Sequence, residues 1–325
     1  MRMLRLIPDG TRIDFVGFRR LGFIISIALI LISVGSLSGR GLNLGIDFLG
    51  GILIEVRAPE PVDLGAMRAT LDAAGVGEVT LQGMERPTDV LIRAQLPEGG
   101  DAAAKSAVDT IRGTLGDTYD YRSVELVGPT IGAELLRKGI IGTVLAVLGI
   151  GLYVAFRFEW QFGVTALIAT LHDVFVTVGL FSLFQIEFNT TTVAALLTLA
   201  GYSVNDTVIV FDRIRETLRK DKSADLKTII NRSINATLTR TVNTSLTTLL
   251  ACLALLFLGG RTLFGFSLAL TWGIVTGTFS SVYVGAAVLL YLPPVRRVPV
   301  KAAADLQPTA EPARLDSRVS SSVQQ

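Results

Sequence analysis

The sequence has few charged residues, one cysteine and one histidine. Of its 325 residues, 18% are charged and 50% are hydrophobic. Soluble domains carry about 25% charged residues, so a chain folded around a single aqueous core is excluded as the starting point. The one cysteine, Cys252, rules out an intrachain disulfide and lies in an apolar run, where we interpret it as a packing residue. The net charge of +2 favours neither nucleic acid nor an acidic substrate as a partner.

Long apolar runs are what the chain has instead. A helix needs about 20 residues, at roughly 1.5 Å each, to cross about 30 Å of hydrocarbon. Six runs are long enough, and we predict six membrane-spanning helices at residues 21–38, 139–158, 162–184, 188–211, 238–258 and 264–292. The first run follows a long basic leader, exceeds the apolar core of a signal peptide and lacks an Ala-x-Ala cleavage site. We therefore interpret it as a retained anchor.

Basic residues outside the runs indicate the orientation. Lys and Arg gather in residues 1–20, in 213–240 and in the C-terminal tail, whereas the short connections on the opposite side contain only Arg261. By the positive-inside rule, both termini are expected in the cytoplasm and residues 39–138 outside it.

Two further segments are expected on the cytoplasmic side. Residues 212–237 are predicted to form a charged helix, most of it a solvated or headgroup-facing surface. Residues 299–325 are rich in Ala, Pro, Ser and Gln and have no apolar period, which is typical of a disordered tail.

The extracytoplasmic segment 39–138 is long enough to be a folded domain. Its residue patterns predict, in order, a strand, a helix, two strands, a helix and a last strand at 51–56, 64–74, 78–84, 90–96, 102–115 and 119–127. The stretch Arg86–Asp89 contains a proline and supplies the turn between the two middle strands. This βαββαβ order predicts an α+β, ferredoxin-like domain beside the membrane helices.

Four ionisable side chains lie inside the predicted spans: His172, Asp173, Asp206 and Arg240. Each costs at least about 2.5 kcal/mol in lipid and needs a partner, a wet cavity or a function. Asp206 lies in a polar turn of its span whose other members are Tyr202, Ser203, Asn205 and Thr207.

More than one role is open for each of these four residues. Arg240 begins the next, antiparallel span at a similar depth, so an ion pair with Asp206 is geometrically allowed, yet Arg240 could also extend to the interface. Asp206 could serve only as a hydrogen-bond acceptor between helices. His172 and Asp173 lie near the midplane and are candidates for a proton relay or for structural hydrogen bonds.

Several motifs together resemble the SecD/SecF family of protein-export membrane proteins, which is related to the resistance-nodulation-division transporters. The resemblance covers about residues 10–295, and its motif in the fourth span is highly specific. The small extracytoplasmic domain resembles that of the SecF members rather than that of SecD. The matching stretches are GIDFLGG at 45–51, VGPTIG at 127–132, ATLHDV at 169–174, GYSVNDTVIVFDRIRE at 201–216 and NATLTRT at 235–241.

This resemblance implies a function in the bacterial cytoplasmic membrane. A protein of this family works with SecD beside the Sec channel and its accessory membrane proteins. It pulls an exported, unfolded polypeptide outward while protons flow inward. The family's proton-coupling aspartate and arginine correspond to Asp206 and Arg240, and Asp173 also matches a family position. We expect the motion to reach the extracytoplasmic domain through junction residues Gly45, Asp47, Gly50, Gly51, Gly128, Pro129 and Gly132.

Two alternatives remain at this stage. The chain could be a half-transporter of the resistance-nodulation-division type that exports a small molecule or a lipid. It could also be a scaffold in which Asp206 and Arg240 form a static salt bridge. No nucleophile triad, phosphate-binding loop or metal-ligand cluster is recognisable, so we expect no enzymatic activity, no metal and no cofactor other than protons as the coupling ion.

Overall fold

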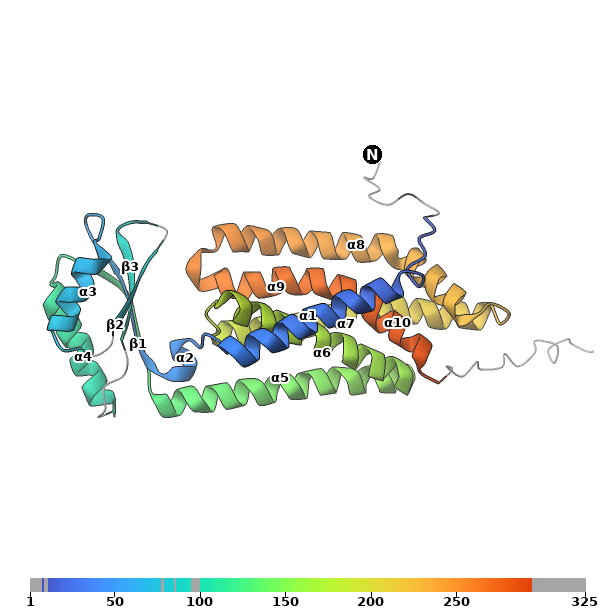
Figure 1. The fold of residues 1–325 in the computed structure, drawn as a ribbon, viewed down its shortest axis with the longest axis horizontal. Coiled ribbons are helices and arrows are strands. Elements are labelled where there is room, and N and C mark those ends of the chain that lie inside the picture. The colour runs from blue at the N-terminus through green and yellow to red at the C-terminus, as the bar shows by residue number, and fades with distance from the viewer. Residues whose placement is uncertain (1–7, 9–10, 77–78, 85, 95–99, 294–325) are drawn as a thin grey trace, which may run out of the picture.

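The computed structural model describes residues 8, 11–76, 79–84, 86–94 and 100–293. A small α/β domain stands at one end of an elongated bundle of helices (Figure 1). The first and last described residues both lie at the end of the bundle opposite to this domain (Figure 1). The expectations for residues 1–7 and for the tail 299–325 fall outside the described residues.

The α/β domain has the element order that the sequence predicted. A four-stranded sheet has the strand order β2-β3-β1-β4, and every neighbouring pair is antiparallel. Asp89 N–H donates to the Arg86 carbonyl at 2.9 Å, which closes the predicted turn between β2 and β3. The elements are β1 Gly51–Arg57, α3 Leu64–Ala73, β2 Val79–Gly83, β3 Asp89–Ala94, α4 Gly100–Leu115 and β4 Asp120–Val127.

Alternation along the strands explains why the helices cover one face of this sheet. Ile52, Ile54 and Val56 of β1 are fully buried, since every second residue of a strand points to the same side. They pack in one cluster with Leu71 of α3 and Ile111 of α4. The other face of the sheet is turned toward the helical bundle (Figure 1).

An ion pair at the end of β1 and β3 gives this domain a pH dependence. Arg57 Nε and Nη2 donate to the two carboxylate oxygens of Asp89, each at 2.7 Å. This pairing lowers the pKa of Asp89 to about 2. Because the pKa is depressed in the folded state, the ion pair stabilises the domain above the unfolded pKa near 4, and that stabilisation is lost as the pH falls toward 2.

We predict that Asp89→Asn exposes this dependence. Amide exchange of β1 and β3, measured in the full chain by mass spectrometry, should be faster in the variant at about pH 5 and equal in both proteins at about pH 2. Comparing the two proteins at the same pH removes the intrinsic pH dependence of exchange. A rate ratio that stays constant over this range would show that Asp89 does not titrate with folding.

Within the described residues, six helices are long and apolar enough to cross a membrane, which confirms the predicted fold class. The last of them changes character within its length: α9 continues through a π-helical turn at Ser281–Gly285, α10 at Ala286–Val288 and a 3₁₀ turn at Leu289–Tyr291. The long helices are α1 Arg19–Arg40, α5 Pro129–Arg157, α6 Trp160–Phe184, α7 Thr190–Lys220, α8 Leu226–Leu258 and α9 Gly260–Ser280.

Two segments differ from the prediction. Helix α5 begins at Pro129, ten residues before the expected span at 139, because proline suits a first helical position and no breaker follows it. Residues 212–237 do not form a separate charged helix. They are divided between the end of α7 and the start of α8, with a turn at 221–225 between them.

Local contacts explain the turn and why both helices extend past the apolar runs. The Asp221 side chain accepts hydrogen bonds from the Ser223 and Ala224 N–H groups, which reverses the chain. Ile229 and Ile230 of α8 are fully buried and belong to one cluster with Phe211 of α7. The extension is therefore a helical hairpin packed into a core that it shares with other helices of the bundle, rather than mainly a solvated surface.

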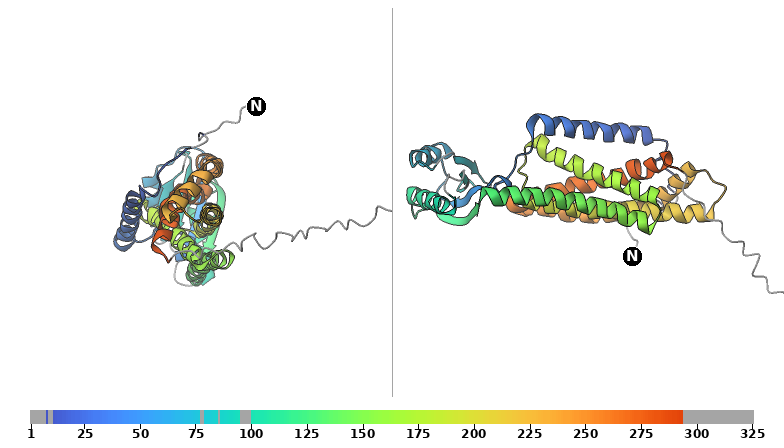
Figure 2. Two further views of the ribbon diagram at one scale, coloured as in Figure 1. Left: turned by 90° about the vertical axis from the view of Figure 1, so that its right-hand side faces the viewer. Right: turned by 90° about the horizontal axis from the view of Figure 1, so that it is seen from below.

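Helix α1 lies at the periphery of the bundle and packs chiefly against α6 (Figure 2). A side-chain carbon added at Gly179 of α6 would lie 2.0 Å from Ser33 Oγ and 2.8 Å from Ser33 Cα. We predict that Gly179→Val forces α1 away and lowers the free energy of unfolding in detergent by about 1 to 3 kcal/mol. Gly142→Val is the matched control, because nothing lies within 4 Å of that position. Equal losses in both variants would contradict this packing argument.

Candidate functional site

Asp173 of α6 is the centre of a buried hydrogen-bond cluster inside the bundle. Its side chain is fully buried. Its Oδ2 accepts hydrogen bonds from Ser203 Oγ of α7 at 2.5 Å and from Ser280 Oγ of α9 at 2.7 Å. One carboxylate therefore joins three membrane helices, which is the use expected for a polar group that cannot reach water.

The neighbouring His172 completes this cluster. Its Nδ1 lies 3.0 Å from the second oxygen of Asp173, Oδ1. Its Nε2 is buried, and among the described residues it has no hydrogen-bond partner. One ring nitrogen is thus held by the carboxylate while the other has an unused bonding position.

Asp206 of α7 lies in a second polar cluster. Its side chain is 1% exposed, and its Oδ2 accepts a hydrogen bond from Ser245 Oγ of α8 at 3.2 Å. Ser245 in turn lies 2.8 Å from Thr278 Oγ1 of α9. The other carboxylate oxygen, Oδ1, is buried without a hydrogen-bond partner in the described part of the chain. This oxygen is free to take up a proton or to accept a further hydrogen bond.

Arg240 does not form a direct ion pair with Asp206 in this structure. Both residues are described, and none of the ion pairs found between described residues within 4.0 Å joins them. Arg240 interacts with Asp206 only through a longer-range Coulombic attraction, and its side chain is exposed on α8. The serine at position 245, rather than the arginine, holds the aspartate here.

The four polar neighbours of Asp206 do not act together. Ser203 is buried and its hydroxyl donates to Asp173. Thr207 donates to the Ser203 carbonyl of its own helix at 3.3 Å. The Tyr202 hydroxyl is buried and has no partner among the described residues. Asn205 is exposed on the outer side of α7. Helical spacing places residues 202, 203 and 206 on neighbouring sides of α7 and only Asn205 away from them, yet Ser203 and Asp206 bond to different helices, so closeness in sequence did not predict the contacts.

The sequence analysis missed three hydroxyl groups of this site. Ser245, Thr278 and Ser280 come from α8 and α9 and complete the two carboxylate clusters. Their only signal was that they are polar residues inside apolar runs. Such residues are frequent there, because a Ser or Thr hydroxyl can bond the carbonyl of the preceding turn.

Exposed polar side chains at membrane depth form a further feature of α7 and α8. On α8, Arg240, Asn243 and Thr247 share one side, since they follow the three- and four-residue spacing of a helix face. On α7, Thr198 and Asn205 are also exposed. The two threonines donate to carbonyls of their own helices, but the arginine and the two asparagines are unfavourable against lipid, so these sides of α7 and α8 require a protein partner or a water-filled space.

The junction between the α/β domain and the bundle is closely packed. Asp47 Oδ2 accepts hydrogen bonds from the backbone N–H and the hydroxyl of Thr190, the first residue of α7, at 2.9 and 2.5 Å. Gly45 N–H donates to the Phe188 carbonyl at 2.9 Å. Asp47 lies in the short helix α2, Ile46–Leu49, and so anchors this helix to the start of α7.

Glycine occupies the junction positions for different structural reasons. Gly50 and Gly51 have φ angles of 76° and 149°, which side-chain-bearing residues rarely adopt. A side-chain carbon at Gly132 of α5 would lie 2.7 Å from the Phe48 carbonyl oxygen, so glycine permits close contact of α5 and α2. Gly128 is the N-cap residue of α5 and Pro129 its first residue. Whether this junction transmits motion stays a prediction.

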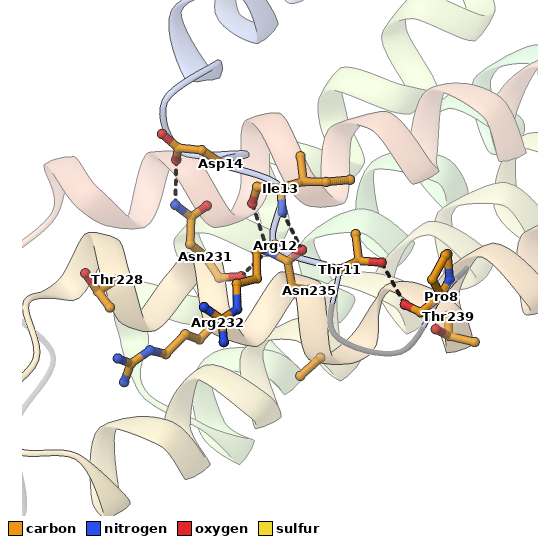
Figure 3. Close-up of a pocket in the computed structure, with 11 residues that line it drawn as sticks. Pro8, Thr11, Arg12, Ile13, Asp14, Thr228, Asn231, Arg232, Asn235 and Thr239 are labelled. Atoms are coloured by element: carbon orange, nitrogen blue, oxygen red, sulfur yellow. Dashed lines mark hydrogen bonds between the residues drawn. The ribbon is translucent and has the colours of Figure 1, made fainter. Parts of the chain in front are cut away.

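A polar cavity of about 710 Å³ lies at the opposite end of the bundle (Figure 3). There, Asn235 of α8 donates to the Ile13 carbonyl at 2.8 Å and accepts from the Ile13 N–H at 2.9 Å. Asn231, one turn earlier, accepts from the Val16 N–H at 3.0 Å and donates to Asp14 at 2.6 Å. These two side chains fix the segment before α1 to the N-terminal part of α8.

No metal site is evident in the described part of the chain, where no group of three or more His, Cys, Asp or Glu side chains could hold an ion. The fold and the buried carboxylates define a polytopic membrane protein with polar clusters inside its bundle and an α/β domain outside it. Family models match the chain twice: "Protein export membrane protein SecD/SecF, C-terminal" over residues 107–294 and "SecD/SecF GG Motif" over residues 35–62. The chain belongs to the SecD/SecF family.

Curated relatives support this assignment over most of the chain. It is 42% identical to the protein translocase subunit SecF of Rickettsia typhi over 290 residues, which are 88% of this chain and 94% of that protein. It is 43% identical to the subunit of the same name from Pseudomonas aeruginosa over 286 residues, 88% of this chain and 93% of that protein. With six helices able to span a membrane, the chain is a multi-pass protein of the bacterial inner membrane.

Solved structures agree with the family. The crystal structure of SecDF from Thermus thermophilus, described as a translocon-associated membrane protein, matches with a TM-score of 0.75 and 38% sequence identity over 87% of this chain. SecDF in a super-membrane-facing form matches with a TM-score of 0.64 and the same identity. This chain spans 38% of the length of the first of these SecDF chains.

Proposed function

We propose that this chain is a subunit of the Sec protein-export machinery that works with SecD to pull an exported polypeptide outward, driven by inward proton flow. Family membership and the SecF relatives support a role in protein export. The observation that carries the proton coupling is Asp206, a carboxylate that is 1% exposed in a membrane helix and has one oxygen without a hydrogen bond among the described residues. Such a group is costly in lipid unless it has a function.

Protonation of Asp206 would change its bonding partners. A charged carboxylate attracts Arg240 and accepts the Ser245 hydroxyl, whereas a neutral carboxyl group has a proton to donate and no longer attracts the arginine. Ser245 and Thr278 connect this change to α8 and α9. We propose that these helices repack with each proton that Asp206 takes up and releases.

The membrane potential supplies enough free energy to shift the equilibrium between two conformations. One charge moved through 100 mV corresponds to about 2.3 kcal/mol, which shifts an equilibrium between two states by about 50-fold. The movement of the exported polypeptide is then directed outward, because the outward-pulling state is favoured only while protons flow.

The exposed polar sides of α7 and α8 support the partnership with SecD. Arg240 and Asn243 on α8 and Asn205 on α7 lie at membrane depth without cover from this chain. A second helical bundle with polar groups would cover them and exclude lipid. We assign this role to SecD, with both termini of this chain in the cytoplasm and the α/β domain outside.

The proposal includes no chemistry on a substrate. Protons are the only coupling ion that it requires, and neither an enzymatic step nor a bound cofactor enters it.

The proposal is tested by reconstituting this chain with SecD and the Sec channel in vesicles whose interior corresponds to the extracytoplasmic side. Export of a reporter protein into the vesicles is measured with a proton gradient and after an uncoupler removes it. We expect this chain to increase export only in the presence of the gradient. Equal export with and without the gradient would leave a scaffold role, and transport of a small molecule with no effect on the reporter would indicate a half-transporter.

A further inference from the structure

We propose that the cleft between the α/β domain and the outer end of the bundle binds an extended segment of the exported polypeptide beside the edge of the sheet. This inference rests on the proposed export function. The cleft has a volume of about 460 Å³ and separates β2 and β3 from the α6–α7 and α8–α9 connections. Figure 1 shows that the face of the sheet left uncovered by α3 and α4 is turned toward the bundle.

The cleft presents the features that an extended peptide needs. Strand β2 is at the edge of the sheet, where a further strand can be added by main-chain hydrogen bonds. Gln82 of β2 lines the cleft, as do Gln185 and Asn189 on the membrane side. Leu256 and Phe264 add an apolar wall. A mixed lining suits chains of many sequences, because polar groups can bond the backbone while side chains of either kind find room.

Arg93 of β3 is the residue that points to a ligand. It lines the cleft and forms an ion pair with Glu187 in the α6–α7 connection. Its Nε is buried and donates to no partner among the described residues. An unmatched buried donor is unfavourable, and a peptide carbonyl is the acceptor that any polypeptide offers.

The chemistry favours a polypeptide over other occupants. A lipid chain would leave the Arg93 donor unpaired, and a small anion would compete with Glu187 for the same guanidinium. An extended peptide satisfies the donor and the sheet edge together. A strand from a partner subunit has the same backbone chemistry, and a titration repeated with SecD distinguishes it, because a partner strand would then displace the peptide.

The test uses the full chain in lipid nanodiscs without SecD. A short fluorescein-labelled peptide of alternating serine and valine is titrated and followed by anisotropy. The control probe is the same peptide with alternate backbone nitrogens methylated, which removes the donors needed for strand addition. Photocrosslinking from p-benzoylphenylalanine in place of Gln82 reports the position, with the same group in place of Arg68, exposed on the outer helix α3, as the control.

We expect binding and a crosslink at position 82, no crosslink at position 68 and weak binding of the methylated peptide. Arg93→Ala should weaken binding about tenfold, as expected for the loss of a charge-assisted hydrogen bond. Arg122→Ala, an exposed arginine on the far edge strand β4, should leave binding unchanged. Glu187→Gln should retain or strengthen binding, because it breaks the ion pair and frees the Arg93 donors.

Three results would overturn the inference: equal crosslinking at positions 82 and 68, equal binding of the methylated peptide, or equal losses in Arg93→Ala and Glu187→Gln. The last result would mean that the ion pair only tethers the domain. The proposed function is judged separately by gradient-driven export. If that export persists in Arg93→Ala with no peptide binding, the inference fails and the proposed function stands.

Discussion

Asp206→Asn is expected to abolish the gradient-dependent part of export while leaving the protein folded. Asparagine keeps the size of the side chain and an oxygen that can accept from Ser245. It cannot take up and release a proton, so a gain of up to about 50-fold at 100 mV should fall to none. The measurement is reporter export into vesicles with and without the proton gradient.

The matched control for this result is Asp212→Asn, which removes a carboxylate from the exposed side of the same helix. It should retain gradient-driven export. Thermal unfolding in detergent checks that both variants are as stable as the unaltered chain. Gradient-driven export that survives Asp206→Asn at full size would refute proton coupling at this residue and leave a structural role between α7 and α8.

Asp173→Ala is expected to produce the largest loss of stability. The variant removes the acceptor for Ser203, Ser280 and His172 in the centre of the bundle, and within the described part of the chain Ser280 alone has a second acceptor there, the Gly277 carbonyl at 3.2 Å. Hydrogen bonds between membrane helices contribute about 0.6 to 2 kcal/mol each, so the expected loss is about 2 to 5 kcal/mol. The free energy of unfolding in mixed detergent measures it.

Two further variants separate structure from proton transfer at Asp173. Asp212→Ala removes an exposed carboxylate and should change stability by less than about 0.5 kcal/mol. Asp173→Asn retains an oxygen that can accept from the two serines. If Asp173→Asn is stable but lacks gradient-driven export, Asp173 and His172 belong to the proton relay that the sequence analysis considered. If it exports normally, the cluster is structural.

The sequence predicted the elements well where a local pattern specifies them. Six apolar runs gave six spanning helices, and alternation with turn residues gave the βαββαβ order, because both signals depend only on the neighbours along the chain. It failed at residues 212–237, where charge was interpreted as exposure. There Ile229 and Ile230 pack against α7, a contact that no periodicity within one helix reveals.

The sequence selected two carboxylates that the structure shows to be buried, but it did not predict their contacts. The cost of a charge in lipid was enough to select Asp173 and Asp206. Depth and charge allowed Arg240 as a partner of Asp206, and the family resemblance implied this pair. The structure places Ser245 against Asp206 instead, and the exposed Arg240 at longer range. Depth along a helix follows from counting residues, whereas the direction of each side chain depends on how neighbouring helices rotate against each other.

The sequence by itself therefore determined that this chain is a six-helix membrane protein with one α/β domain, because length, hydropathy and alternation act locally. It also determined which carboxylates lie at membrane depth. The tertiary structure alone decided that two hydroxyl-bearing helices, α8 and α9, complete the clusters around Asp206 and Asp173, and that Arg93 faces Glu187 across the cleft. Hydrogen bonds of this kind join residues far apart in the chain, and only the packing of whole helices and strands brings them together.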